Sequence, residues 1–296
     1  MSFRKDKFLS LAGADLNSLS LDELKQLANK LLNGSLHGIC FSPYDESQKP
    51  GDILDPKDIE YKVNFLKPYF KWCRSFSCTE DNELIPAIAK KAGFKTLVGA
   101  WLSDDLEKNE TELNKLIELC NNGVIDIAAV GNEALYRKEL TEDQLIEYID
   151  RAKSEIDVPV GYVDAYYEFT NRPRLSDACD VILANCYPFW EGCQAEYSLL
   201  YMKEMYQQAV RAGKGKPVII TETGWPSEGS ALEAAQPSYE NYLRYFIAAQ
   251  LWSMEDDIDM FYFSSFDEPW KVGDEGDVGA FWGIWDKDLK LKFENS

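Results

Sequence analysis

The stretch VIITETGWP, residues Val218–Pro226, decides the fold. Its β-branched apolar run predicts a buried strand, which ends on a carboxylate before Gly224 and Pro226 turn the chain into a loop. An ionised carboxylate is costly to bury without a partner, so Glu222 at this position needs an explanation. A second apolar run, Ile125–Glu133, also ends on a glutamate. Two strand ends that each deliver a carboxylate predict an active site.

From Gly38 onward, strand-like runs alternate with helix-like segments. The predicted strands are Gly38–Ser42, Trp72–Phe76, Lys95–Ala100, Ile125–Val130, Val160–Asp164, Val181–Asn185, Val218–Glu222 and Met260–Phe266. The predicted helices are Asp58–Tyr69, Glu83–Ala92, Glu107–Asn122, Thr141–Ile156, Arg174–Cys179, Ser198–Arg211 and Ser238–Glu255. This α/β alternation predicts a single (β/α)8 TIM barrel. A doubly wound sheet is the alternative, but the sequence has no G-x-G-x-x-G and no phosphate-binding loop.

The first 36 residues predict one additional helix. Ser20-x-x-Glu23 is a capping box, leucines follow at helical spacing from Leu21 to Leu31, and Gly34 is a stop signal. We therefore expect an N-terminal helical extension over residues 1–36 and a catalytic barrel over residues 37–296.

Composition excludes several classes of function. A formal charge of −20 argues against binding nucleic acid or an anionic membrane surface, because phosphate contacts need clustered Lys and Arg. No run approaches the ~18 apolar residues of a membrane span. The single His37 and seven cysteines without a C-x-x-C pair predict no metal and no cofactor. Cys73 with Cys78, and Cys186 with Cys193, could pair, but an odd total leaves at least one thiol free.

In a TIM barrel the active site lies at the carboxyl ends of the strands. The polar residues predicted there are Ser42, Tyr44, Arg74, Trp101, Asn132, Glu133, Asp164, Asn185, Tyr187, Glu222, Asp267 and Glu268. This set contains no His or Cys, which excludes Ser-His-Asp and Cys-His catalysis. A carboxylate pair with aromatic walls suits glycoside cleavage, in which one acid protonates the leaving group and the other attacks.

Strands four and seven lie roughly across such a barrel. Glu133 and Glu222 can therefore converge to the ~5–5.5 Å that retaining chemistry needs. The alternative is that both are structural ion-pair partners, for example of Arg74.

Three motifs resemble those of a known family. Gly131-Asn132-Glu133 and Thr221–Ser227 resemble the two signatures of glycoside hydrolase family 17, and Ser264–Lys271 (SSFDEPWK) resembles the strand-eight signature of its fungal cell-wall members. The resemblance runs from about Gly38 to Trp285. It implies a (β/α)8 barrel that acts on β-1,3-glucan with retention of configuration.

The resemblance also implies roles for single residues. By position, Glu133 would be the general acid/base, Glu222 the nucleophile, and Asn132 a donor to the sugar 2-hydroxyl. Because the nucleophile must stay ionised, we expect Arg74 and Tyr187 beside Glu222.

Further substrate-binding residues are expected around this centre. Glu268 and Lys271 could form an ion pair that touches sugar hydroxyls; the alternative is a surface pair worth under ~1 kcal/mol. Asp164, at the end of strand five, is also expected to bind substrate. The candidates for stacking on sugar faces, with core packing as the alternative, are Tyr44, Tyr166, Phe189, Trp225, Trp270 and Trp282.

Hydrolysis and glucan transfer share every step up to the covalent intermediate. The compact segment Pro188–Gln194 and the FDEPWK variant resemble glucan-remodelling members, so we predict a β-1,3-glucanosyltransferase with residual hydrolysis, acting as a monomer. The alternatives are an endo-β-1,3-glucanase that mainly hydrolyses, a β-1,4-specific barrel, and a catalytically inert glucan-binding barrel. The resemblance implies a secreted or cell-wall protein, whereas Met1–Lys7 is charged and no apolar signal segment follows it.

Overall fold

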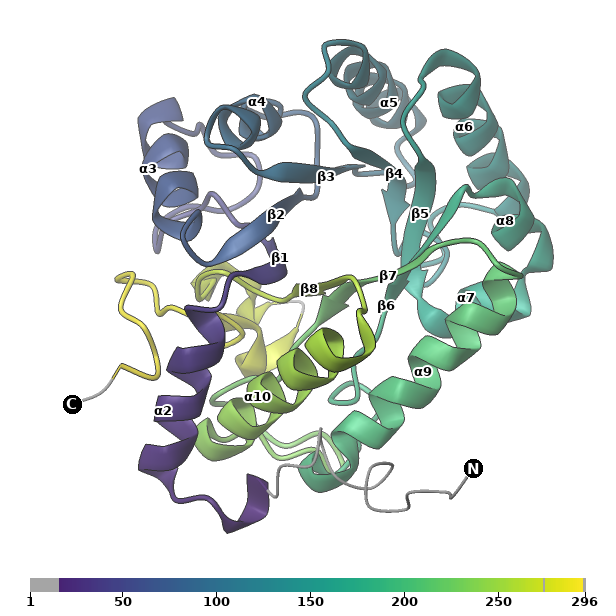
Figure 1. Ribbon diagram of the computed structural model, residues 1–296. Helices are drawn as coiled ribbons and strands as arrows, with labels where there is room; N and C mark the ends of the chain where they lie inside the picture. The colour runs from purple at the N-terminus through teal and green to yellow at the C-terminus, as the bar shows by residue number, and fades with distance from the viewer. Residues whose placement is uncertain (1–15, 274, 295–296) are drawn as a thin grey trace.

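The computed structural model describes residues 16–273 and 275–294. Within them, parallel strands β1 to β8 pair in sequence order and close into a barrel (Figure 1). Closure is made by β1, which pairs with both β2 and β8. The strands are β1 (Leu36–Cys40), β2 (Phe70–Ser75), β3 (Lys95–Ala100), β4 (Ile127–Asn132), β5 (Val160–Ala165), β6 (Val181–Asn185), β7 (Val218–Thr223) and β8 (Met260–Tyr262). The predicted (β/α)8 barrel is confirmed.

Helices surround the barrel as an outer layer (Figure 1). They are α2 (Leu21–Leu32), α3 (Pro56–Leu66), α4 (Leu84–Lys91), α5 (Leu106–Asn121), α6 (Glu142–Glu155), α7 (Tyr166–Asn171), α8 (Pro173–Ala178), α9 (Ser198–Gly213) and α10 (Tyr239–Asp256). Short 3-10 turns are η1 (Leu16–Ser18), η2 (Ala195–Tyr197), η3 (Pro269–Val272) and η4 (Gly276–Ala280). Two helices follow β5, where the sequence predicts only one.

Helix α2 is part of the outer layer. The predicted capping box is present, since Ser20 accepts from the Glu23 backbone N–H and the Glu23 carboxylate accepts in return. Leu24 and Leu32 are fully buried, and α2 lies beside α10 in the position between α10 and α3 (Figure 1). The helix thus completes the ring, and a boundary at residue 36, where β1 begins, stays a prediction.

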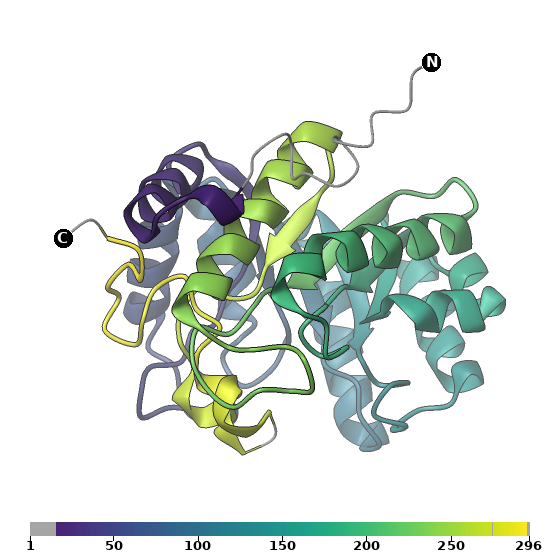
Figure 2. The ribbon, with the colours of Figure 1, turned by 90° about the horizontal axis from the view of Figure 1, so that it is seen from below.

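Strand β8 is shorter than predicted because the chain after Tyr262 shares its backbone hydrogen bonds between the barrel and a returning segment. The N–H groups of Phe263 and Ser265 still donate to Thr223 of β7 and Cys40 of β1. The N–H of Ser264 instead donates to the Trp282 carbonyl, and the N–H of Ile284 donates back to the Ser264 carbonyl. Figure 2 shows this returning segment, with η3 and η4, at the same end of the barrel as the loop between β7 and α10.

All seven cysteines are buried free thiols, so neither candidate pair is a disulfide. Burial raises the pKa of the Cys40 thiol to about 12, which keeps this group protonated and unreactive. Across residues 16–273 and 275–294, no helix has the length and apolar character needed to cross a bilayer. The same residues contain no group of three His, Cys, Asp or Glu side chains that could hold a metal ion.

Candidate active site

A cavity of about 400 Å³ opens at the carboxyl ends of the strands. Both predicted catalytic carboxylates, Glu133 and Glu222, line it. The other lining residues are Tyr136, Ala165, Tyr166, Tyr167, Asn185, Tyr187, Trp190, Glu191, Phe263, Glu275 and Trp282. The cavity therefore lies where a TIM barrel places its active site.

Glu222, the penultimate residue of β7, is held by one group from β2 and one from the loop after β6. The Arg74 guanidinium forms an ion pair with it, Nη1 to Oε1 at 2.9 Å, and the Tyr187 hydroxyl donates to Oε2 at 2.8 Å. Burial and the Glu222 charge raise the pKa of Tyr187 well above its ordinary value. The phenol thus remains a donor, and both contacts favour the ionised carboxylate.

Arg74 connects Glu222 to a second predicted site residue. Its side chain is only 2% exposed, and Nη2 donates to Asn132 Oδ1 at 2.7 Å. The guanidinium also lies 4.2 Å from the centre of the Phe76 ring. Burial opposes its charge, but Glu222 and Cys40 leave the pKa of Arg74 raised, so it stays a cation. One buried cation therefore fixes Glu222 and Asn132 together.

Glu133, directly after β4, has a different set of neighbours. Asn185 Nδ2 donates to its Oε1 at 2.8 Å, and Thr221 donates to Asn185 Oδ1, which fixes the orientation of the amide. Burial, followed by the charge of Glu222, raises the pKa of Glu133 to about 7. This carboxyl group can therefore carry a proton near neutral pH.

The Glu268–Lys271 pair is not an exposed surface pair. The two side chains are 6% and 11% exposed, with Oε2 and Nζ 2.8 Å apart. Lys271 Nζ also lies 4.1 Å from the centre of the Phe263 ring, which lines the cavity. Burial opposes the charge of Lys271, but Glu268 and Glu275 keep its pKa raised. The pair thus brings a fixed cation to the edge of the cavity.

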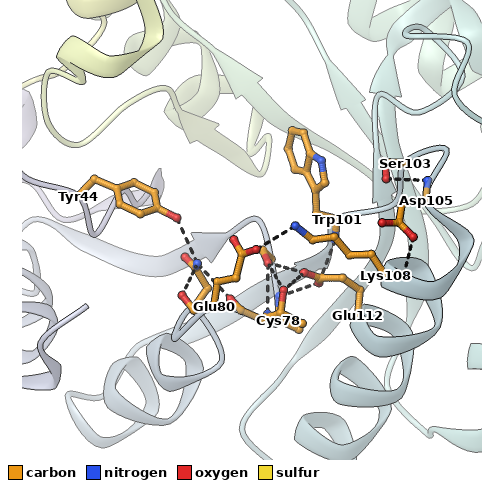
Figure 3. A network of polar contacts seen from close by, with 11 residues as sticks. Tyr44, Cys78, Glu80, Trp101, Ser103, Asp105, Lys108 and Glu112 are labelled. Atoms are coloured by element: carbon orange, nitrogen blue, oxygen red, sulfur yellow. Dashed lines mark hydrogen bonds and ion pairs between the residues drawn. The ribbon is translucent and has the colours of Figure 1, made fainter. Parts of the chain in front are cut away.

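The loops after β1, β2 and β3 form a braced wall (Figure 3). Tyr44 meets Trp270 edge-to-face at 5.9 Å, and its hydroxyl accepts from Asn82. Fully buried Glu112 of α5 accepts from the backbone N–H groups of Cys78 at 2.8 Å and of Trp101 at 3.1 Å. A single carboxylate therefore ties the loop after β2 to the loop after β3 (Figure 3).

Two of the predicted stacking residues require correction. Trp225 and Phe189 are fully buried, with ring centres 5.3 Å apart. The Trp225 indole donates to the Gln236 carbonyl and packs on Tyr245 of α10. The indole therefore lies between the barrel and α10, where a sugar has no access.

Asp164 also requires correction, because its side chain has no exposed surface. Its Oδ1 accepts from the Ala165 N–H at 2.7 Å, and the Tyr162 hydroxyl donates to its Oδ2. The Tyr136 N–H also donates to Oδ2, so the carboxylate is enclosed by protein donors and is not accessible to a substrate.

Tyr166 and Trp282, two of the candidates for stacking on sugar faces, line the cavity. Trp282 is almost fully buried, and its ring centre lies 5.5 Å from the ring centres of both Tyr187 and Trp190. The Tyr166 hydroxyl donates to Glu191 at 3.3 Å.

Several cavity residues have no role in the sequence prediction. Asn185 is among the polar residues predicted at the strand ends, but the sequence assigns it no contact with Glu133. Trp190 and Glu191 lie in an irregular loop without a periodic signal, as do Tyr136 and Glu275. Their place in the cavity depends on how the loops fold.

Comparison with known proteins agrees with this geometry. The model of the BtgE/BtgC glycoside hydrolase domain matches residues 38–283. The chain belongs to this family. The match begins in β1 and ends in the segment that follows η4, and it includes both carboxylates.

Alignments with three similar proteins extend over most of this chain and most of each relative. A glucan 1,3-beta-glucosidase of Candida albicans is 30% identical over 82% of this chain and 87% of its own length. One of Schizosaccharomyces pombe is 26% identical over 97% of this chain and 95% of its own. The crystal structure of a glycoside hydrolase family 17 beta-1,3-glucanosyltransferase from Rhizomucor miehei has a TM-score of 0.77 and 29% identity, covering 88% of this chain and 96% of that one. The resemblance to glycoside hydrolase family 17 is confirmed.

Proposed function

We propose that this chain cleaves β-1,3-glucan with retention of configuration and transfers the glucan to another chain, with residual hydrolysis. One observation carries the proposal: two carboxyl groups share one cavity but have opposite surroundings. Glu222 is paired with a buried cation and a phenol, whereas burial raises the pKa of Glu133 to about 7. Contrasting surroundings of this kind distinguish a nucleophile from an acid.

The first half-reaction follows from these surroundings. The ionised Glu222 attacks the anomeric carbon, and the bond from that carbon to the glycosidic oxygen breaks. Glu133 gives its proton to the departing oxygen. Because Arg74 occupies the Asn132 Oδ1, the Asn132 amide nitrogen remains to donate to the sugar 2-hydroxyl.

The second half-reaction returns Glu133 to its starting state. With Glu222 esterified, its charge no longer raises the pKa of Glu133, so Glu133 can accept a proton. It takes the proton from an incoming hydroxyl group while that oxygen bonds to the anomeric carbon and Glu222 leaves. A water molecule in this position gives hydrolysis, and a glucan hydroxyl gives transfer.

The aromatic lining of the cavity supports transfer. The acid/base stands on the side of the leaving group, and we infer that an acceptor sugar binds against Tyr136, Tyr166 and Trp190, which line the same cavity as Glu133. The Trp190 side chain is 41% exposed and can stack on a sugar ring. An occupied acceptor site keeps water from the glycosyl-enzyme.

Hydrolysis is the second candidate function. The Candida and Schizosaccharomyces relatives are named as glucosidases, and both outcomes use the same two carboxylates. If the resemblance to cell-wall members extends to location, the substrate is wall β-1,3-glucan.

Product sizing on a linear β-1,3-gluco-oligosaccharide of defined length tests the proposal. Products longer than the starting sugar are expected, and exclusively shorter products would show a hydrolase. A β-1,4 oligomer of equal length should remain uncut. If neither oligomer yields new sizes, the enzymatic proposal fails and an inert binding barrel remains.

Trp190→Ala tests the acceptor side. Longer products should decrease several-fold relative to shorter ones, while cleavage continues. Tyr61→Ala is the matched control, because Tyr61 is an exposed aromatic of α3 in the outer layer. An unchanged product ratio in Trp190→Ala would remove this residue from the acceptor site.

A further inference from the structure

Glu133 has an unusual backbone conformation. Its φ is +53°, in the left-handed region that side chains other than Gly, Asn and Asp seldom occupy. Its N–H donates to the Val163 carbonyl of β5 at 2.8 Å. A residue persists in this region only where its surroundings hold it there.

Two buried side chains of β5 fix the backbone of the turn that follows Glu133. The Leu135 N–H donates to the Tyr162 hydroxyl at 2.9 Å, and the Tyr136 N–H donates to Asp164 Oδ2 at 3.3 Å. The Tyr162 hydroxyl in turn donates to Asp164. Both side chains are fully buried, so the turn that follows Glu133 is anchored to the barrel interior by two side chains of β5.

Gly131 makes room for this arrangement. Its φ is +92°, and a Cβ atom there would lie 3.1 Å from the Tyr162 ring. The ring therefore packs against the backbone two residues before Glu133, while the Tyr162 hydroxyl binds the backbone two residues after it. Tyr162 therefore contacts the backbone both before and after Glu133.

We propose that Tyr162 and Asp164 are positioning residues that hold Glu133 in the orientation needed to give and take the proton. The proposal rests on the acid/base role of Glu133. Both side chains have no exposed surface, so neither is placed to touch the substrate. They act through the turn that carries the acid.

The charge of Asp164 has a second effect. The groups that face Glu133 are Glu222 of β7, Asn185 of β6, Asp164 of β5 and Arg137 of its own loop. Asp164 and Glu222 raise the pKa of Glu133, while Asn185 and Arg137 lower it. Asp164 itself is faced by Tyr162 and by Glu168 of α7. Replacing Asp164 with Asn should therefore lower the pKa of Glu133.

A comparison of leaving groups separates positioning from general structural damage. Glycosyl transfer from a 2,4-dinitrophenyl β-glycoside needs no acid, because the bond to the anomeric carbon breaks with its electron pair leaving on a stable dinitrophenolate. The first-turnover burst of dinitrophenolate thus reports attack by Glu222 alone. Cleavage of the matching β-1,3-gluco-oligosaccharide reports attack together with proton donation.

The variants are Tyr162→Phe and Asp164→Asn, with Glu133→Gln as reference. Tyr242→Phe is the matched control, since Tyr242 is also fully buried and its hydroxyl donates to a backbone carbonyl, that of Gly283. Both test variants should lose about 10- to 100-fold in oligosaccharide cleavage, the range that a misplaced group costs. Their dinitrophenolate burst rates should stay within about threefold of the wild type. Tyr242→Phe should show neither loss.

Three outcomes would overturn the inference. They are equal losses in both assays, no loss in either assay, and an alkaline limb of the oligosaccharide pH profile that does not move to lower pH in Asp164→Asn. Tyr162→Phe removes a single oxygen atom. Comparing its thermal unfolding midpoint with that of Tyr242→Phe shows how much of any loss in activity comes from lost stability. If Glu133→Gln loses both activities equally, the role of Glu133 fails instead, which separates the two proposals.

Discussion

The ends of β4 and β7 carry the same residue type in contrasting surroundings. At β7, Glu222 meets a guanidinium from β2 and a phenol from the loop after β6. At β4, Glu133 meets an amide from β6 and the charge of Glu222. The two glutamates occupy equivalent positions at strand ends, but their different partners give them different chemical roles.

The difference shows how this barrel assigns chemical roles. A cation and a donor favour the charged form of a carboxyl group, whereas burial next to a like charge favours the neutral form. The partners of each glutamate come from strands remote in sequence, so the roles depend on barrel closure. Each prediction below alters one side of this contrast.

Glu222→Gln should have the largest effect. Losing the attacking carboxylate should reduce both cleavage and transfer by at least about a thousandfold, the scale seen when a covalent nucleophile is removed. Calorimetric titration with a β-1,3-gluco-oligosaccharide should still detect binding. Retained activity within tenfold of the wild type would exclude Glu222 as nucleophile.

Arg74→Met should be strongly destabilising. It leaves the Glu222 charge buried without its cation, which costs about 3–5 kcal/mol. Urea unfolding at neutral pH measures the loss, and the double variant Arg74→Met/Glu222→Gln should recover part of it.

Arg151→Met is the matched control for this prediction. Its ion pair with Glu110 is partly exposed, and such pairs contribute about 0–1 kcal/mol. Should Arg74→Met lose no more than this control, the buried pair would not stabilise the site.

Tyr187→Phe should reduce kcat/KM by about 10- to 100-fold, because a hydrogen bond to a charged group is worth about 1.5–3 kcal/mol. Steady-state kinetics on the oligosaccharide measure the change. Tyr239→Phe removes a phenol that donates to the Lys292 carbonyl away from the cavity, and it should leave kcat/KM unchanged. A similar loss in both variants would contradict a specific role for Tyr187.

The pH profile should show the smallest effect. Glu133 is protonated below its pKa of about 7, so activity is present on the acid side and lost as pH rises through this value. Above it, kcat/KM should fall about tenfold per pH unit. An alkaline limb more than two units higher would show that another group supplies the proton.

The sequence by itself determined the alternation of strands and helices, the closure into a barrel, and the two strand-end glutamates. These follow from local periodicity and from the fact that parallel strands bring their carboxyl ends to one side of a sheet. Arg74 and Tyr187 were also predictable as partners of Glu222, because an ionised nucleophile requires a cation and a donor. Glu268 and Lys271 were predictable as a pair, since opposite charges lie close together in the loop after strand eight.

Only the tertiary structure decided which side chains face the cavity. Trp225 and Asp164 lie at strand ends as the true cavity residues do, yet both are fully buried, Trp225 against Phe189 and Tyr245, and Asp164 beside Tyr162. Trp190 and Asn185 enter the cavity because loops and strands distant in sequence meet there. The direction in which a side chain points depends on backbone turns and on packing between elements remote in sequence. Neither produces a periodic pattern in the sequence.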